Sequence, residues 1–240
     1  MLGDESDEKS LSKRQQGAVI NLLGRAILAG DYRPGDILPG EITYAMSLGI
    51  SRGAVREAIQ GLSAKGMVES RRKAGTRVTP RHRWSMLDPD VLAWAFAGDP
   101  DFSLLYSLAE LRLANEPLAA RLAARLRDKS NLSQLKASLN KIEDNVLSFD
   151  LIQVPIQEFH QLVLFASKSE ALIALAPAVA TVVQWSVKLR QRSHKLALDH
   201  ISVYHAIYDG IASGDASLAE TAAISLAVRD LDEIRLANKL

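Results

Sequence analysis

Residues 49–58 read GISRGAVREA, and this stretch decides how the first third of the chain is interpreted. Ser51 is a favourable N-cap, because its hydroxyl can accept a hydrogen bond from a backbone N–H of the first helical turn. The pattern that follows predicts a helix from there to about Lys65, closed by Gly66. At about 100° per residue, the expected core face of this helix carries only apolar side chains, namely Val55, Ala58, Ile59 and Leu62.

The neighbouring face of the same helix presents polar and small residues within an arc of about 100°: Arg52, Gly53, Arg56 and Gln60. The fork of an arginine can donate two hydrogen bonds to guanine O6 and N7, or to a phosphate. The N-terminal end of a helix also offers free N–H groups to phosphate. This face therefore predicts contact with DNA, and the alternative is a solvated face with a salt bridge from Arg52 or Arg56 to Glu57.

Shorter elements surround this helix in an informative order. The pattern predicts a helix over residues 17–28 and a short helix from about Glu41 to Ser47. Two strand-like runs follow the central helix, at 67–70 and 76–79, and the basic segment RRKAG joins them. Helix, helix, tight turn, helix and hairpin is the order of a winged helix-turn-helix, so residues 13–80 are expected to form a DNA-binding domain.

The distribution of charge supports a polyanionic partner. Residues 10–83 hold thirteen Lys and Arg against five Asp and Glu, a net charge of +8, whereas residues 84–240 hold fifteen against nineteen, a net charge of −4. A basic module joined to a mildly acidic remainder suggests a nucleic acid, and the alternative is a chance excess of surface Lys and Arg. The acidic segment 1–12 is expected to be a disordered tail.

Composition excludes several classes of protein. The chain has 240 residues with 48% hydrophobic and 24% charged residues, which is ordinary for a soluble globular protein. It contains no cysteine, which excludes disulfides, thiol catalysis and cysteine-ligated zinc. No apolar run reaches the ~18 residues needed to cross a bilayer, and the acidic start is unlike a targeting signal. We therefore expect a cytoplasmic protein without a membrane partner.

Four motifs in order resemble the GntR family of transcription regulators: ILAGDYRPGDILP at 27–39, GISRGAVREA at 49–58, LSAKGMV at 62–68 and GTRV at 75–78. The resemblance implies that Arg52 and Arg56 contact DNA and that the tip of the wing enters the minor groove. Ile42 stands where family members often carry Arg, and Lys73 where they often carry Gly. The expected DNA-binding residues are Glu41, Thr43, Tyr44, Ser51, Arg52, Gly53, Arg56, Gln60, Arg72, Lys73, Gly75 and Thr76.

The remainder of the chain reads as helical, which makes the fold class mainly α. Residues 81–100 are expected to form a linker and a short helix. Breaks at polar and glycine positions then predict helices over 101–127, 131–148, 152–167, 170–192, 196–213 and 216–237. Pro117 and Pro177 fall inside helical patterns and are expected to kink them. Residues 101–238 are therefore predicted to form an all-α bundle that binds an effector and dimerises.

This second region resembles the ligand-sensing FCD domain of the FadR-type GntR subfamily. The resemblance rests on ELRLANEP at 110–117, on Phe159-His160 and on the segment from Ala206 to Asp215. The linker at 83–92 is similar to that of regulators of sugar-acid operons, which implies a small hydroxylated carboxylate as effector.

Many FCD domains bind a divalent metal through one Asp and three His. The matching positions here hold Ile156, His160, Tyr204 and Leu226, so one ligand of four remains. Because tight binding of such a metal requires at least three protein ligands, we predict that the site is lost and that the protein needs no cofactor. A rearranged site using His194, His200 or His205 remains an alternative.

Without a metal, an effector carboxylate needs other partners, and we predict Arg112, His160, Trp185 and Tyr204. Each has a plainer interpretation: Arg112 as a surface residue paired with Glu110 or Glu116, His160 as a buried structural histidine, and Trp185 as core packing beside Val182 and Leu189. The end of this helical pattern is predicted to be basic and solvated, with the alternative that it faces a phosphate; its basic residues are Arg190, Arg192 and Lys195.

The sequence thus predicts a homodimeric, sequence-specific DNA-binding transcription regulator whose operator affinity responds to a small carboxylate. Alternatives are an effector-independent dimeric DNA-binding protein and an acyl-CoA-sensing regulator. No nucleophile elbow, H-E-x-x-H or P-loop is present, so catalysis is not expected.

Overall fold

The structure is a computed structural model that describes residues 4–193 and 198–238, without the side chains of 4–16, 149, 198 and 199. The chain divides into two compact units, the first up to Pro100 and the second from Asp101 onward. No helix among the described residues is long and apolar enough to span a membrane.

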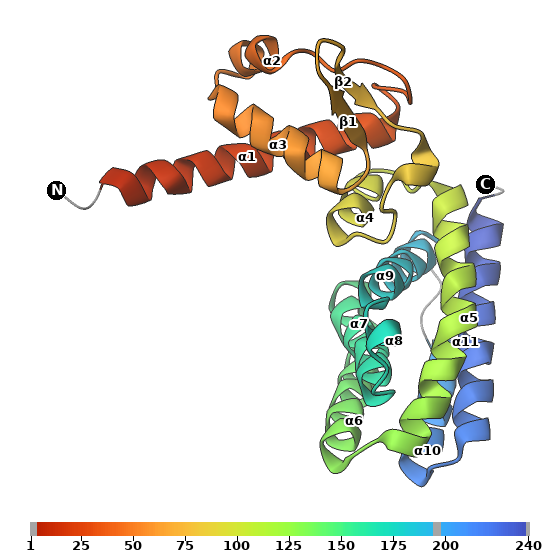
Figure 1. Ribbon diagram of the computed structural model, residues 1–240. Helices are drawn as coiled ribbons and strands as arrows, with labels where there is room; N and C mark the ends of the chain where they lie inside the picture. Colours follow the sequence, from red (N-terminus) through yellow and green to blue (C-terminus); the bar gives the residue numbers. More distant parts are fainter. Residues whose placement is uncertain (1–3, 194–197, 239–240) are drawn as a thin grey trace. The chain divides into compact units, whose positions relative to one another are not determined.

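The first unit is a winged helix-turn-helix (Figure 1). Its helices are α1 (Asp4–Ala29), α2 (Glu41–Leu48), α3 (Arg52–Ala64), the 3₁₀ turn η1 (Arg81–Arg83) and α4 (Pro89–Ala95). Its strands β1 (Val68–Arg71) and β2 (Gly75–Val78) pair antiparallel, with Val68 opposite Val78 and Arg71 opposite Gly75. The predicted fold of this region is confirmed, including the basic hairpin after α3.

The first helix is longer than predicted. It begins at Asp4, whereas the sequence predicted a helix from Gly17 and a disordered tail over residues 1–12. The described part of that tail, from Asp4, is helical. The physical reason is that no Gly or Pro interrupts 4–16 and that the acidic residues at its start favour the positive end of the helix dipole. Residues 1–3 lie outside the described residues.

The central helix α3 is built as its sequence predicts. The Ser51 hydroxyl accepts a hydrogen bond from the backbone N–H of Ala54 at 3.2 Å. Gly49, which closes α2, has φ of 65°, a left-handed conformation that glycine adopts without steric cost. The four residues predicted for the core face, Val55, Ala58, Ile59 and Leu62, are all buried.

The short helix α4 belongs to the first unit rather than standing apart. The indole N–H of Trp94 donates to Asn21 Oδ1 at 2.6 Å, and the ring lies directly against Gly24 of α1. A Cβ at Gly24 would come within 2.3 Å of that ring, so only glycine permits the contact. Trp84 donates to the Thr79 carbonyl at 3.0 Å. The segment expected as linker and short helix therefore packs on the DNA-binding domain.

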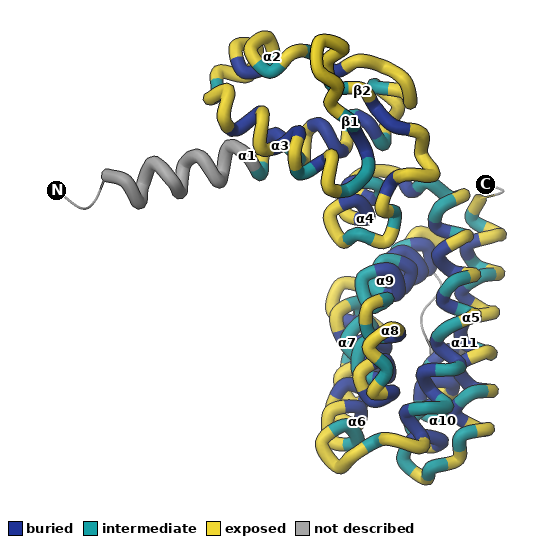
Figure 2. Tube along the Cα trace, in the orientation of Figure 1, coloured by how far each residue is buried: buried dark blue, intermediate teal, exposed yellow. Residues whose placement is uncertain are grey.

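The second unit is an all-α bundle, as predicted (Figure 2). Its helices are α5 (Phe102–Leu126), α6 (Lys129–Asp144), α7 (Phe149–Ala166), α8 (Glu170–Ile173), α9 (Ala176–Arg192), α10 (Leu198–Ser213) and α11 (Ala216–Ala237). Figure 1 shows α5 and α11 lying side by side in opposite directions. Buried apolar side chains of α5, α6, α7, α9, α10 and α11 form one continuous core.

One predicted helix is divided in two. The single helix expected over 170–192 ends at Ile173 and resumes at Ala176. Pro177 occupies the first turn of α9, where its missing N–H has no intrahelical partner to lose. It therefore starts a helix instead of kinking one, which corrects the expectation for Pro177. Pro117 does lie inside α5.

Candidate DNA interface and candidate effector site

The outward face of α3 is open to solvent. Arg52, Gly53, Arg56 and Gln60 are all exposed. The Arg52 side chain is 67% exposed, and its Nε lies 3.2 Å from Glu41 Oε2, so α2 and α3 are joined at this surface by one weak ion pair. This arrangement leaves both arginine forks accessible to an external partner.

The predicted contacts from α2 and the wing flank this face within the same unit. Nine of the twelve predicted DNA-binding residues are exposed, and Glu41, Tyr44 and Thr76 are half-buried. The Thr76 hydroxyl lies 2.8 Å from that of Ser70 across the hairpin. Burial, together with the nearby Tyr32, raises the pKa of Tyr44, so its hydroxyl stays protonated and can donate a hydrogen bond.

Lys73 sits at the tip of the wing with φ of 66°. This left-handed conformation explains why glycine is common there in the resembling family, and a lysine adopts it at a steric cost. Gly75 follows with φ of 81°. Arg72 and Lys73 are both exposed, so the tip presents two positive charges.

In the second unit, Arg112 lies in the interior instead of on the surface. It is 1% exposed, and its Nε donates to Glu116 Oε2 at 2.5 Å. Its Nη1 forms an ion pair with Asp230 Oδ2 on α11. Two of its donors are therefore engaged by carboxylates of the protein, and a carboxylate ligand could reach them only by displacing Glu116 or Asp230.

His160 and Tyr204 join the same cluster. The His160 Nδ1 lies 2.7 Å from Glu116 Oε1, and because an ionised carboxylate only accepts, Nδ1 donates. The Nε2 of His160 lies 3.3 Å from Arg112 Nη2 and 3.4 Å from the Tyr204 hydroxyl. A neutral imidazole that accepts at Nε2 satisfies this geometry.

Arg190 extends this buried network along α9. Its Nη1 donates to Asp230 Oδ1 at 2.8 Å and to Glu233 Oε2 at 3.0 Å, and it lies 3.4 Å from His200 Nε2. Asp230 therefore accepts from both Arg112 and Arg190. We call the residues linked in this way the polar network: Arg112, Glu116, His160, Arg190, His200, Tyr204, Asp230 and Glu233.

Mutual attraction keeps the charged members of the polar network ionised. Burial alone would raise the pKa of Asp230, but the neighbouring Arg112 and Arg190 hold it well below its ordinary value. Burial likewise opposes ionisation of Glu116, and Arg112 and His160 lower its pKa. The pKa of Arg112 is raised, because Glu116 and Asp230 outweigh the effect of burial.

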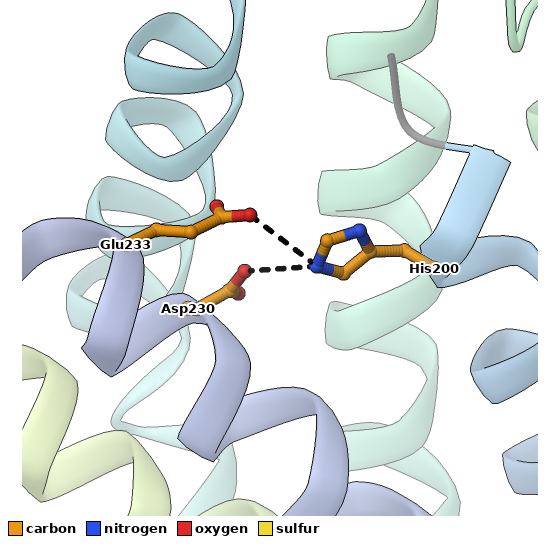
Figure 3. A group of neighbouring side chains, drawn as sticks. All are labelled: His200, Asp230 and Glu233. Carbon is orange, nitrogen blue, oxygen red and sulfur yellow. Dashed lines mark ion pairs between the residues drawn. The ribbon is translucent and has the colours of Figure 1, made fainter. Parts of the chain in front are cut away.

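Three members of the polar network that can each offer a metal ligand lie close together, namely His200, Asp230 and Glu233. Figure 3 marks the ion pairs of His200 with Asp230 and Glu233. His200 Nε2 lies 3.9 Å from Asp230 Oδ1 and 3.7 Å from Glu233 Oε1. The three ligand atoms lie within 4.8 Å of one another. The Arg190 guanidinium already bonds both carboxylates, so a metal ion could enter only by displacing it.

The four positions that match the metal ligands of the resembling domains do not suit a metal. Ile156 and Leu226 are each 1% exposed and pack in the apolar core. Tyr204 has a pKa raised by burial and by Asp230, so it remains a neutral phenol. The one nitrogen ligand, His160, is held by Glu116. These residues therefore do not fit a divalent cation.

Of the four predicted effector residues, the structure brings together Arg112, His160 and Tyr204. Trp185 is also buried, on α9, where the Lys188 ammonium lies 4.6 Å from its ring centroid. The pairing of Arg112 with Glu116, considered from the sequence as a surface contact, is present but buried. Asp230 and Glu233 were not predicted as members of the polar network, and Arg190 was predicted to lie in a solvated end. The signal for Asp230 was present, because it falls at helical spacing with apolar residues Leu226, Ala227 and Ile234.

Comparison with known families matches both units. Residues 15–78 match the family described as bacterial regulatory proteins, gntR family, and residues 107–228 match the FCD domain.

Among its relatives, the galactonate operon transcriptional repressor of Escherichia coli K12 is 30% identical, covering 90% of this chain and 96% of its own. The uncharacterised HTH-type transcriptional regulator YieP of the same organism is 32% identical, covering 87% and 94%. A putative L-lactate dehydrogenase operon regulatory protein of E. coli K12 is 31% identical, covering 82% and 79%.

Solved structures share the fold. Lar, which controls the Listeria monocytogenes agr system, aligns with a TM-score of 0.54 at 18% identity over 92% of this chain and 96% of its own. E. coli McbR/YncC aligns with a TM-score of 0.50 at 18% identity over 92% and 97%.

Proposed function

The chain belongs to the GntR family of bacterial transcription regulators and carries an FCD domain, and from this premise we propose how its residues serve regulation. It is a sequence-specific DNA-binding regulator. We propose that Arg52 and Arg56 read the operator and that a small carboxylate, bound in the second unit, controls operator affinity.

The observation that carries the DNA-binding assignment is the outward face of α3. Both arginines are exposed, and the apolar residues beside them are buried, so the helix is rigidly mounted with its polar side free. A helix presented in this way suits the major groove, where arginine reads guanine through two parallel hydrogen bonds. Arg72 and Lys73 at the wing tip would add contacts to phosphate.

The test begins by selecting an operator from a random duplex library with the full-length protein. Replacing Arg56 by Ala should weaken binding to that operator by about 1–3 kcal/mol at constant salt, with relaxed preference at one base position. The matched control is Arg125→Ala, since Arg125 is exposed on α5 outside the DNA-binding unit. Unchanged operator affinity in both Arg52→Ala and Arg56→Ala would overturn the assignment of α3.

We further propose that the protein is a homodimer. One helix-turn-helix reads a half-site, and two copies related by a two-fold axis read a pseudo-palindrome with half-sites one helical turn or a multiple apart. The selected operator should therefore show inverted symmetry, and sedimentation should give twice the 26.2 kDa mass of the chain. A monomeric mass together with an asymmetric operator would contradict this.

The effector assignment is supported by the relatives, whose names connect them to galactonate and L-lactate operons. Both compounds are small hydroxylated carboxylates. Operator binding should be measured with galactonate, L-lactate and an acyl-CoA added in turn. A change with a carboxylate supports the proposal, a change with only the acyl-CoA favours an acyl-CoA sensor, and no change favours an effector-independent DNA-binding protein.

We also propose that no divalent metal is required. The support is the poor match of Ile156, Tyr204 and Leu226 to metal coordination and the ion pairs of Arg190 with Asp230 and Glu233. Elemental analysis of the purified, untagged protein should give well below one metal per chain. About one zinc, nickel or manganese per chain would contradict the proposal and point to His200, Asp230 and Glu233.

We propose that the protein is not an enzyme and acts in the cytoplasm, where its DNA operator lies. The relatives named above are transcription regulators. Turnover of a bound effector by the purified protein would contradict the first statement.

A further inference from the structure

A cavity of about 420 Å³ opens at one end of the second unit. Its apolar wall consists of Phe102 on α5, Leu189 on α9, and Leu236 and Ala237 on α11. Its polar wall includes Arg190, Arg192 and Glu233. The volume lies within the range of about 300–1,000 Å³ that is typical of small-molecule sites, as is an apolar lining with a few polar groups.

Arg190 and Glu233 connect this cavity with the polar network. Arg190 is 3% exposed and is held by two carboxylates, of which Asp230 is buried and Glu233 has a side chain 19% exposed. Of these two partners, Glu233 is therefore the one that solvent can reach. Moving its carboxylate into water costs less free energy than moving that of Asp230. Arg192 is exposed beside it and adds a positive charge to the lining.

We propose that this cavity binds a monocarboxylate with an apolar body, whose carboxylate replaces that of Glu233 on Arg190. Exchanging one carboxylate for another leaves Arg190 paired, so no uncompensated charge is buried. The apolar body would lie against Phe102, Leu189 and Leu236. This inference keeps the carboxylate of the proposed effector but gives it an apolar body in place of hydroxyl groups, and it rests on the proposed function for its regulatory meaning.

The apolar wall also argues against a polyhydroxylated ligand at this place. Hydroxyl groups buried against Phe102 and the leucines would lose water without gaining hydrogen-bond partners, which is unfavourable for binding. Selectivity at this site should therefore favour an apolar acid over a sugar acid.

Asp230 connects Arg190, which lines the cavity, with the other charged residues of the polar network. Asp230 accepts from Arg190 with one oxygen and from Arg112 with the other. Arg112 in turn bonds Glu116, and Glu116 bonds His160. A ligand bound to Arg190 would therefore be connected, through charged contacts, with residues on α9, α11, α5 and α7. It would shift the protein from one conformation to another only if it bound the two conformations with different affinity.

The experiment is calorimetric titration of the full-length protein with three probes, without DNA. These are 3-phenylpropanoate, the uncharged 3-phenylpropan-1-ol, and galactonate. We expect 3-phenylpropanoate to bind at least tenfold more tightly than either of the others. Ala237→Trp fills the cavity and should weaken binding of 3-phenylpropanoate at least tenfold. The matched control is Ala137→Trp, since Ala137 is exposed on α6 and does not line the cavity.

A second variant tests the role of charge. Arg190→Gln combined with Glu233→Gln removes the exchangeable ion pair while preserving the local net charge. It should abolish the preference for 3-phenylpropanoate over 3-phenylpropan-1-ol, while the alcohol binds as before. If this variant does not fold, the Ala237→Trp and Ala137→Trp pair still decides the location of the site.

The outcomes separate this inference from the proposed function. Failure of 3-phenylpropanoate to bind, or equal binding to the wild type and Ala237→Trp, overturns the inference. If galactonate changes operator affinity while 3-phenylpropanoate fails to bind, the proposed function stands and this site is wrong. If 3-phenylpropanoate binds here but no carboxylate changes operator affinity, the site stands and the effector part of the proposed function fails.

Discussion

The two units use arginine in opposite ways. On α3, Arg52 and Arg56 are exposed, and Arg52 has one weak contact with Glu41. In the bundle, Arg112 and Arg190 are 1% and 3% exposed and are held by carboxylates on two sides.

The difference shows which arginines are free to recognise a ligand. An exposed guanidinium keeps its hydration until a partner replaces it, so it contributes to binding and little to folding. A buried guanidinium is already matched by charges of the protein, so its removal leaves those charges unpaired. Residue type alone therefore does not identify a binding arginine.

The largest expected effect is on the buried side of this comparison. Arg112→Ala should lower the free energy of unfolding by about 3–5 kcal/mol, because Glu116 and Asp230 lose a buried partner. Urea denaturation of the full-length protein measures it. Arg125→Ala on the exposed face of the same helix should change the value by less than about 0.5 kcal/mol. A loss below about 1 kcal/mol for Arg112→Ala would show that the polar network is loosely held.

Acid should weaken the bundle by a smaller amount than loss of Arg112. The pKa values of Glu116 and Asp230 are lower in the folded protein than their ordinary values of 4.5 and 3.8. Their stabilising contribution is therefore complete above those ordinary values and decreases as pH falls below them. Urea denaturation at pH 7, 5, 4 and 3.5 should show constant stability above pH 5 and a decline below it. Glu116→Gln should have a shallower decline, and an equally steep one would exclude Glu116 as a source.

A surface ion pair should matter much less. Glu41→Ala removes the partner of Arg52, whose side chain is 67% exposed. Pairs of this kind contribute about 0–1 kcal/mol, so the free energy of unfolding should fall by less than about 1 kcal/mol. Urea denaturation at low and high salt measures the change. A loss above 2 kcal/mol would mean that Glu41 has a structural role beyond this pair.

The smallest expected effect is that of Arg56 on folding. Arg56→Ala should change the free energy of unfolding by less than about 0.5 kcal/mol, although it weakens operator binding. The contrast with Arg112→Ala is then complete: one variant folds normally and binds poorly, and the other unfolds easily. Thermal and urea denaturation beside operator titration would test both statements on one preparation. A clearly destabilised Arg56→Ala variant would remove the distinction between the two units.

The winged helix-turn-helix could be predicted because its signals are local. Ser51 caps α3 within three residues, Gly49 and Gly66 close turns, and the apolar residues of α3 recur at helical spacing. The break before α9 was harder to place, since Pro177 suits both a kinked helix and the first turn of a new one.

The sequence by itself determined the family, the two units and the residues that α3 presents to solvent, because each depends on neighbours within a few positions of the chain. Only the tertiary structure decided the environment of the bundle arginines. Arg112 and Asp230 are 118 residues apart, and Arg190 and Asp230 are 40 apart. Helical periodicity places each side chain on a face of its own helix, but the packing of α5, α9 and α11 decides which faces meet, and so which charges are neutralised inside the protein.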